Sequence, residues 1–261
     1  MSALIHPSSV VDPAARLGEG VRIGPFCVIG PEVTLGPGVE VKSHAVVTGW
    51  TEVGPETVIF PHATVGEVPQ DLKYRGERTR LTVGARCRIR ESVTLNTGTE
   101  GGGGLTSVGD DCLLMTGAHV GHDAHLGNRV ILANGVAVAG HCQIGDDVIV
   151  GGLSGIHQWV RVGHGAIIGA VTMVTNDVIP YGLVQGPRGE LDGLNLVGLK
   201  RRGMDRAAIT ALRHAYDDLA KGEGSFMDRA RRLAEMADSD AVREVAAFIL
   251  SASDRSFLTP K

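Results

Sequence analysis

Aliphatic side chains recur at every sixth position through the first two-thirds of this chain, and few folds accept such a period. The pattern covers 26 positions in three runs, Ile5 to Val65, Val83 to Leu95, and Val108 to Val174. An amphipathic helix has a period near 3.6 and an exposed strand a period of two, whereas a parallel β-helix of short flat strands has a period of six. The period therefore predicts a parallel β-helix and a mainly β protein.

Each group of six residues is expected to form one short strand and one turn, with the aliphatic residue in the core. Three groups make a coil of about 18 residues, and coils stack about 4.8 Å apart. One coil cannot bury its own apolar face, so the stack makes the core. The composition agrees, because 37 glycines suit tight corners and an aromatic content of 4% suits a thin core.

Charge and cysteine placement limit the classes of function. The net charge of −4 argues against nucleic acid as a partner. No apolar run is long enough for a membrane span and no signal peptide is visible, so we expect a soluble, cytoplasmic protein. The four cysteines share the fifth position of their groups, which predicts small core side chains rather than a metal site or disulfides: Cys27, Cys87, Cys112 and Cys142.

Two insertions interrupt the pattern, near residues 68–82 and 98–107. Loops on a repeat scaffold often carry function, although either insertion could be a tolerated surface excursion. The second contains the run Gly101–Gly104 but lacks the Lys-Ser/Thr ending of a phosphate loop. We expect a β-helix domain over residues 1–187 and a helical domain over residues 188–261.

Helical periodicity appears in the C-terminal region. Asp205 is a suitable N-cap for a helix over Arg206–Lys221. A second helix is expected to begin near Ser225 and run through Met236, and Ser239 can cap a third that runs through Leu250. A basic cluster stands before these helices and is either a solvated helix end or a site for phosphates or an acidic partner: Lys200, Arg201, Arg202 and Arg206.

The coil length places three histidines on one edge of the predicted β-helix. Counted in coils of 18 residues from Val108, His122, His141 and His157 fall at neighbouring positions of successive coils and span roughly 10 Å. His119 lies around the adjacent corner. Scattered polar surface residues would not share a register, so we interpret the column as functional.

The residues of this column suit general-base catalysis, since histidine titrates near neutrality. Asp123 follows His122 and could fix its tautomer, and the N–H of Gly140 could serve an oxyanion. No serine or cysteine nucleophile is suitably placed, because Cys142 should point inward. These features favour direct transfer with no covalent enzyme intermediate, and one class that they fit is an acyltransferase with histidine as the base.

Two other classes stay open. Three histidines at a β-helix interface can bind zinc, as in the γ-class carbonic anhydrases, but the spacing of His119, His122 and His125 differs from their ligand pattern. A purely structural β-helix is the other class, and the insertions and the histidine column argue against it.

The motifs of the chain resemble those of the bacterial UDP-N-acetylglucosamine O-acyltransferases, the family that begins lipid A biosynthesis. They are spread over the full length: GEVPQDLKY at 66–74, IRESVT at 89–94, LLMTGAHVGHD at 113–123, ILAN at 131–134, AGH at 139–141, HQ at 157–158 and GLKRRG at 198–203. The resemblance implies a left-handed β-helix, a C-terminal helical domain and a homotrimer with active sites between adjacent subunits. The N-acyltransferase of the same pathway carries an extra N-terminal domain, whereas the pattern here begins at Ile5. The N-acyltransferase is therefore the less favoured match.

The resemblance also implies a reaction. A (3R)-3-hydroxyacyl chain would pass from acyl carrier protein to the 3-position of UDP-N-acetylglucosamine, with no metal and no cofactor besides the 4′-phosphopantetheine of the carrier. His122 would be the general base, Asp123 its orienting partner and the Gly140 N–H the oxyanion donor.

Substrate contacts follow from the same resemblance. The first insertion would reach substrate across the subunit boundary with Gln70, Asp71 and Lys73. The sugar, phosphate and acyl positions would be lined by His119, His141, His157 and Gln158. The nucleotide would be held by Asn195, Arg201 and Arg202, and the acidic carrier protein would be attracted by Lys200 and Arg206.

The chain departs from the family pattern at positions that bear on specificity. Asn96-Thr97 stands where the family often has His-Arg, and Val197 where it often has Glu. A 3-amino UDP-sugar, which would give an amide, therefore stays open as the acceptor. Ala170 occupies the place of an acyl-chain ruler, where Gly permits longer chains and Met shorter ones, so we expect a length of about C12.

Overall fold

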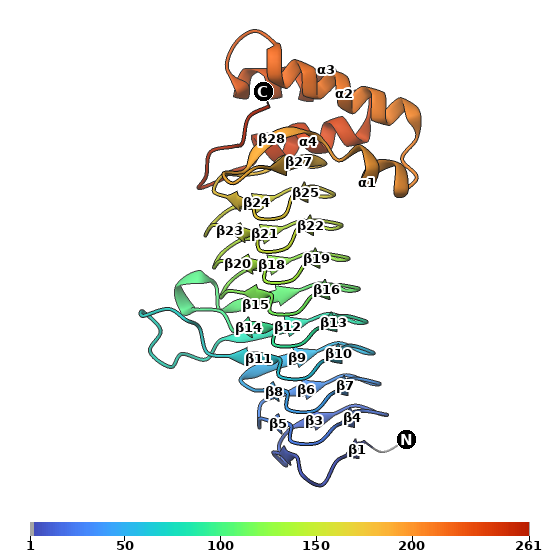
Figure 1. Cartoon of the computed structure of the whole chain (residues 1–261). Helices are drawn as coiled ribbons and strands as arrows, with labels where there is room; N and C mark the ends of the chain where they lie inside the picture. The colour runs from blue at the N-terminus through green and yellow to red at the C-terminus, as the bar shows by residue number, and fades with distance from the viewer. Residues whose placement is uncertain (1–2, 261) are drawn as a thin grey trace.

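In the computed structural model, which describes residues 3–260, short strands stack into a long coil that carries helices at its C-terminal end (Figure 1). Consecutive strands enter three parallel sheets in rotation, so that every third strand pairs. The 26 aliphatic positions of the sequence pattern fall one in each strand from β1 to β26. The predicted parallel β-helix is therefore confirmed, while Met1, Ser2 and Lys261 of the predicted domains lie outside the described residues.

Each sheet collects one face of the coil. The first sheet contains β1 (Leu4–Ile5), β4 (Arg22–Ile23), β7 (Glu40–Val41), β10 (Val58–Ile59), β13 (Arg88–Ile89), β16 (Leu113–Leu114), β19 (Ile131–Leu132), β22 (Ile149–Val150), β25 (Ile167–Ile168), β27 (Gly182–Gln185) and β28 (Glu190–Leu194). The second contains β2 (Val10–Val11), β5 (Val28–Ile29), β8 (Val46–Val47), β11 (Thr64–Glu67), β14 (Thr94–Asn96), β17 (His119–Val120), β20 (Ala137–Val138), β23 (Gly155–Ile156) and β26 (Met173–Val174). The third contains β3 (Arg16–Leu17), β6 (Thr34–Leu35), β9 (Trp50–Val53), β12 (Arg80–Val83), β15 (Leu105–Val108), β18 (His125–Leu126), β21 (Gln143–Ile144) and β24 (Arg161–Val162).

From β1 to β26, the register follows the predicted coil length wherever no insertion intervenes. Leu4 pairs with Arg22 and His119 pairs with Ala137, a step of 18 residues in each case. The step widens to 30 residues between Val58 and Arg88, across the first insertion. It is 25 residues between Thr94 and His119, across the second. Both insertions therefore leave the coil and return without changing which residues face the core.

The core consists of the aliphatic residues that recur at every sixth position of the chain and of the small side chains at the fifth position of each group of six. Leu95, Leu114 and Leu132 are fully buried. The four cysteines are buried and free, as expected. Burial raises the pKa of the Cys142 thiol to about 12, so this thiol stays protonated and is no nucleophile.

The insertions are shorter than the sequence indicated. The first leaves after Glu67 and ends before Arg80, because residues 80–82 already belong to β12. The second leaves after Asn96 and ends before Leu105, with one short 3-10 turn at Glu100–Gly102. Two loops of this central region project from the same side of the coil (Figure 1).

The helical region contains α1 (Leu196–Arg201), α2 (Arg206–Lys221), α3 (Phe226–Met236) and α4 (Asp240–Leu250). The three predicted helices are confirmed as α2, α3 and α4. Two features were not predicted: the short helix α1 and the antiparallel pairing of β27 with β28. Because β28 remains in the first sheet, strand structure continues beyond the predicted boundary at residue 187.

A buried ion pair joins the β-helix to the C-terminal segment. Arg161 Nε donates to Asp177 Oδ2 over 2.7 Å, and both side chains are at least nine-tenths buried. Arg161 also donates to Ser251 Oγ and to the Ala252 carbonyl, and Ser253 Oγ donates to the same Asp177 carboxylate. These contacts bring residues 251–255 onto the side of the β-helix. Over residues 3–260, no helix combines the length and apolarity that crossing a bilayer requires.

Candidate active site

The predicted histidine column lies in the turns that join second-sheet strands to third-sheet strands, here called the histidine edge (residues 121–124, 139–142 and 157–160). His122, His141 and His157 occupy three successive turns of this edge, which confirms the predicted register. The His141 N–H donates to the His122 carbonyl over 3.0 Å, and the two rings meet edge to face with centroids 4.9 Å apart.

His122 and Asp123 form a buried pair. His122 Nδ1 lies 2.9 Å from Asp123 Oδ2, and the two residues are 7% and 2% exposed. A carboxylate can only accept, so Nδ1 carries the proton and Nε2 of the neutral ring is left with a free lone pair. This is the arrangement a general base requires.

The same turn position holds Asp123, His141 and Trp159 in successive coils, and all three have a left-handed backbone, with φ of 59°, 62° and 68°. Such a conformation costs a non-glycine residue roughly 1–3 kcal/mol, and Asp and His are among the residues that tolerate it best. The strained turns stack side chains along the edge, since the His141 ring lies flat on Trp159 with centroids 3.8 Å apart.

Gly140 lies directly against the His122 ring. A Cβ added at Gly140 would be 2.6 Å from His122 Cε1 and 2.7 Å from Nε2. Within residues 3–260, no atom accepts a hydrogen bond from the Gly140 N–H. The predicted role as oxyanion donor therefore has a free N–H beside the base to support it.

Two neighbouring histidines have lowered pKa values, which favours their neutral forms. His119 projects from β17, where Nδ1 lies 2.8 Å from Thr94 Oγ1. Burial, followed by the charge of His122, lowers the pKa of His119. Burial also lowers the pKa of His141, while the nearby Asp123 carboxylate opposes the shift. Neutral imidazoles can offer both a donor and an acceptor to a substrate.

The tip of the first insertion acts electrostatically on the histidine edge of its own chain. The pKa of Asp71 is lowered, first by the Lys73 N–H that donates to its carboxylate over 2.9 Å, and also by the charges of His122 and His141. In turn, the charge of Asp71 raises the pKa of His141 and the charge of Lys73 lowers it. Gln70 and Lys73 are exposed. These effects act within one chain. That the first insertion also reaches substrate across a subunit boundary stays a prediction.

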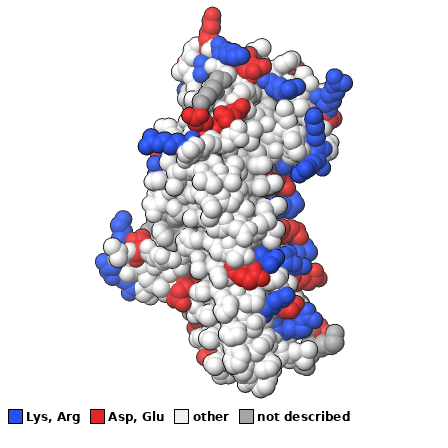
Figure 2. Space-filling view, viewed as in Figure 1, with Lys and Arg blue, Asp and Glu red and all other residues white. Residues whose placement is uncertain are grey.

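The predicted nucleotide residues lie on another edge, in and beside the turns between third-sheet and first-sheet strands, here called the basic edge. Asn195 caps α1 by accepting from the Gly198 N–H, and its amide donates to the Gly165 carbonyl over 2.9 Å. The Arg202 guanidinium reaches the same carbonyl at 3.4 Å. Lys200, Arg201 and Arg206 are exposed, and Figure 2 shows positive charge gathered over α1. Asn195 is 5% exposed, so its amide is committed to holding α1 in place.

Ala170 lies on the remaining edge, in the exposed turn between β25 and β26. The predicted residues are therefore distributed over all three edges of the β-helix. The structure brings together His119, His122, Asp123, Gly140 and His141, with Asp71 and Lys73 in electrostatic reach. It does not bring Asn195, Arg201, Arg202 or Ala170 to them within one chain.

Three residues of the site were missed by the sequence reasoning. Thr99 donates to Asp123, Trp159 stacks on His141, and Arg255 lies with a guanidinium nitrogen 2.7 Å from His157 Nδ1. Arg255 also donates to the Gln158 carbonyl over 3.1 Å. Trp159 shares the turn position of His141, so the coil length could have found it. Thr99 and Arg255 belong to an insertion and to the C-terminal tail, where no repeat predicts position.

Some residues of the histidine edge are of the types that bind metal ions. His122, Asp123 and His141 offer ligand atoms within 4.8 Å of one another. However, both Asp123 oxygens already accept hydrogen bonds from Thr99 and His122. The trio considered from sequence does not assemble, because His125 points from the third sheet and is hydrogen-bonded to Ser107.

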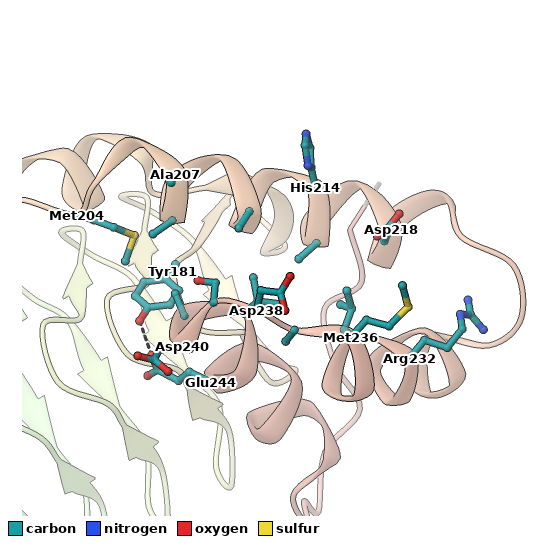
Figure 3. Close-up of a pocket in the computed structure, with 18 of the residues that line it drawn as sticks. Tyr181, Met204, Ala207, His214, Asp218, Arg232, Met236, Asp238, Asp240 and Glu244 are labelled. Atoms are coloured by element: carbon teal, nitrogen blue, oxygen red, sulfur yellow. Dashed lines mark hydrogen bonds between the residues drawn. The ribbon is translucent and has the colours of Figure 1, made fainter.

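One cavity opens at the histidine edge and a larger one opens in the helical region. A small one of about 150 Å³ is lined by Asp123, His141 and Trp159 together with Ser253 and Asp254 of the C-terminal tail. A larger one of about 970 Å³ opens among α2, α3 and α4, where Tyr181 donates to Glu244 (Figure 3). None of the predicted site residues, all of which the structure describes, lines the larger cavity.

Comparison with known proteins identifies the family. A model of the UDP-N-acetylglucosamine O-acyltransferase domain 2 matches residues 177–258, and a model of the bacterial transferase hexapeptide matches residues 14–49 and 106–140. The acyl-[acyl-carrier-protein]–UDP-N-acetylglucosamine O-acyltransferase of Rhizobium johnstonii is 50% identical over 260 residues, which cover 99% of this chain and 96% of that protein. The chain belongs to this acyltransferase family.

Further members of the acyltransferase family agree. The Paracoccus denitrificans protein of the same name is 69% identical over 203 residues, 78% of this chain and 77% of that one. The solved UDP-N-acetylglucosamine acyltransferase of Francisella novicida superposes with a TM-score of 0.95 at 34% identity, over 99% of this chain and 94% of that chain. The family resemblance predicted from the motifs is confirmed.

Proposed function

We propose that this chain transfers a (3R)-3-hydroxyacyl chain from the thioester of acyl carrier protein to the 3-hydroxyl of UDP-N-acetylglucosamine, the first step of lipid A biosynthesis. The observation that carries the proposal is the buried His122–Asp123 pair beside a free Gly140 N–H, in a member of this acyltransferase family. We place the reaction in the cytoplasm, as the family resemblance implies.

In the proposed mechanism, Nε2 of His122 takes the proton of the 3-hydroxyl as its oxygen attacks the thioester carbonyl. Asp123 stabilises the imidazolium that forms. When the tetrahedral intermediate collapses, the C–S bond breaks and the imidazolium returns the proton to the sulfur of 4′-phosphopantetheine. The products are an ester and a free thiol, and the enzyme needs no cofactor of its own.

The Gly140 N–H is the proposed donor to the oxyanion. In other enzymes, removal of one such donor costs ~2.7–4 kcal/mol of transition-state stabilisation. His122→Ala should lower kcat by about 10²–10⁴-fold with the assembly intact, since a positioned base contributes that much. Full activity in this variant would remove the assigned base.

We further propose that the enzyme is a homotrimer of left-handed β-helices, with each site between two chains. The distribution of the predicted residues supports this, because the histidine edge and the basic edge lie on different sides of the third sheet. A closed ring of three would bring the histidine edge of one chain to the basic edge of the next. Arg201 and Arg202 would then hold the nucleotide, and exposed Lys200 and Arg206 would attract the acidic carrier protein.

The remaining assignments concern substrate positions. His119, His141, His157 and Gln158 would line the sugar, phosphate and acyl groups, and Gln70, Asp71 and Lys73 would close over them. Ala170, exposed in its turn, would limit the acyl chain to about C12.

The deciding experiment is an assay of the purified chain with 3-hydroxyacyl carrier-protein thioesters of several lengths, against UDP-N-acetylglucosamine and its 3-amino analogue. We expect an ester as the main product, with the C12 chain dominant. Preference for the 3-amino sugar would select the amide-forming alternative, and absence of transfer to either sugar would refute the proposal. Stoichiometric zinc, with activity lost on chelation, would replace direct transfer by a metal mechanism.

A further inference from the structure

The second insertion is built around the carboxylate of Asp123. The Thr99 N–H lies 2.9 Å from Oδ1 and 3.0 Å from Oδ2, and the Thr99 hydroxyl donates to Oδ2 over 2.6 Å. The Asp123 N–H donates to Thr106 Oγ1 over 2.7 Å. Two residues that flank the glycine-rich run therefore hold both the backbone and the carboxylate of Asp123.

The glycines of the insertion allow this approach. A Cβ added at Gly102 would lie 2.2 Å from Asp123 Cγ, and one at Gly98 would lie 2.7 Å from Oδ1. The loop closes on itself, because the N–H groups of Gly102 and Gly104 both donate to the Thr99 carbonyl. Gly103 and Gly104 have φ of 98° and 76°, where glycine is favoured. Within the run, close packing on the carboxylate thus explains Gly102, and backbone conformation explains Gly103 and Gly104.

The hydrogen bonds to Asp123 have a consequence for His122. Oδ2 accepts from both Thr99 groups and from His122 Nδ1, and the Asp123 side chain is 1% exposed. A buried charge is tolerated only when its hydrogen bonds are made. With both oxygens held, the carboxylate cannot turn away from the imidazole, so the His122 ring keeps its proton on Nδ1.

We propose that Thr99, carried by the 97–104 insertion, is a positioning residue that fixes Asp123 and, through it, the tautomer of the base His122. The inference deepens the proposed function and rests on it. Thr99 is assigned no contact with substrate, so its loss should lower kcat and leave both KM values nearly unchanged.

The first test compares Thr99→Val with Thr99→Ser. Valine keeps the β-branched shape and the backbone N–H but removes the hydroxyl, and we expect kcat to fall about 10- to 100-fold, as when one charge-assisted hydrogen bond to an orienting group is lost. Serine should restore kcat to within about threefold of the wild type. Thr51→Val is the matched control, because the buried Thr51 hydroxyl donates to the Thr48 carbonyl and not to Asp123. Equal activity of Thr99→Val and the wild type would overturn the inference.

A second pair of variants does not depend on the hydroxyl. Gly102→Ala places a methyl group against the carboxylate, whereas nothing lies within 4 Å of the same methyl at Gly101, one residue earlier. We expect Gly102→Ala to lower kcat by at least about tenfold and Gly101→Ala to change it by less than about twofold. Equal effects of the two would contradict packing on Asp123.

Two further measurements separate positioning from folding. In the His122→Ala background, Thr99→Val should cause no additional loss, whereas a purely structural role would cost the same in both backgrounds. Nitrogen-15 NMR of labelled histidines reports the tautomer without any substrate. We expect Nδ1–H for His122 in the wild type and in Thr99→Ser, and mixed tautomers in Thr99→Val.

The NMR result also distinguishes this inference from the proposed function. A wild type that shows the expected tautomers but transfers no acyl group would refute the function and leave the positioning role standing. An active wild type whose tautomer is unchanged in Thr99→Val would refute the positioning role alone.

Discussion

At the scale of single residues, the His122 ring is confined between the Asp123 carboxylate and the α-carbon of Gly140. The carboxylate fixes its tautomer, and the missing side chain of Gly140 leaves room for the ring. Gly140→Ala should therefore displace the imidazole and lower kcat by about 10²-fold, since small displacements of catalytic groups have effects of that size. Steady-state kinetics, with the melting temperature as a check on folding, measures this. Wild-type kcat in a folded variant would show that the space beside the ring is not needed.

The lowered pKa of His119 makes a prediction about stability. Its ordinary value is 6.5, and burial lowers the pKa in the folded chain, so below about pH 6.5 the unfolded chain binds more protons at this position. Stability from His119 is thus fully present above its ordinary pKa and is lost as the pH falls toward the folded pKa. His119→Gln should lose less unfolding free energy than the wild type between about pH 7.5 and 5.5.

Urea unfolding at the two pH values would test the His119 prediction. The exposed His214 on α2 provides the matched control, as His214→Gln. Equal acid sensitivity of His119→Gln and the wild type would mean that burial of the imidazole has no energetic effect.

The residues that could be predicted were those fixed by chain adjacency or by the repeat. Asp123 is next to His122, and His141 follows one coil later with one residue of offset. Thr99 could not be predicted, because its place depends on how an insertion folds back over the coil. Arg255 could not be predicted either, since it reaches His157 from the far end of the chain.

At the scale of elements, the helix caps differ in a way that can be measured. Ser225 forms a capping box with Asp228 at the start of α3, whereas Ser239 occupies the same position in α4 without a side-chain hydrogen bond. Ser225→Ala should lower the free energy of unfolding by about 1 kcal/mol, and Ser239→Ala by much less. Denaturant titration of the two variants checks this, and equal losses would contradict the capping geometry.

Long or repeated elements were predictable and short ones were not. The strands β1 to β26 follow from a repeat that only one kind of coil satisfies, and α2, α3 and α4 follow from caps and periodicity. α1 has only six residues and depends on Asn195 bonding to Gly165, a contact between distant parts of the chain. β27 and β28 pair antiparallel in a region that no longer follows the six-residue period.

At the scale of the whole molecule, the three edges of the coil carry different chemistry. The histidine edge holds the proposed base, the basic edge holds the proposed nucleotide residues, and Ala170 lies on the remaining edge. Within one chain these groups face different directions, so each proposed site requires a neighbouring chain to complete it. The sequence could predict which residues share an edge, because register is local. Which edge of a neighbouring chain completes the site is not local, so it could be predicted only from the family resemblance.

Mixed assemblies test this requirement most directly. His122→Ala and Arg201→Ala chains, each expected to be nearly inactive alone when UDP-N-acetylglucosamine is kept below KM, would be unfolded together in equal amounts and refolded. If each site takes its base from one chain and its nucleotide residues from the next, about a quarter of the sites in random trimers should carry both intact groups, and about a quarter of the wild-type rate should return. If the mixture stays as inactive as the separate variants although trimers form, the base and the nucleotide residues do not meet between chains, and the proposed site is wrong.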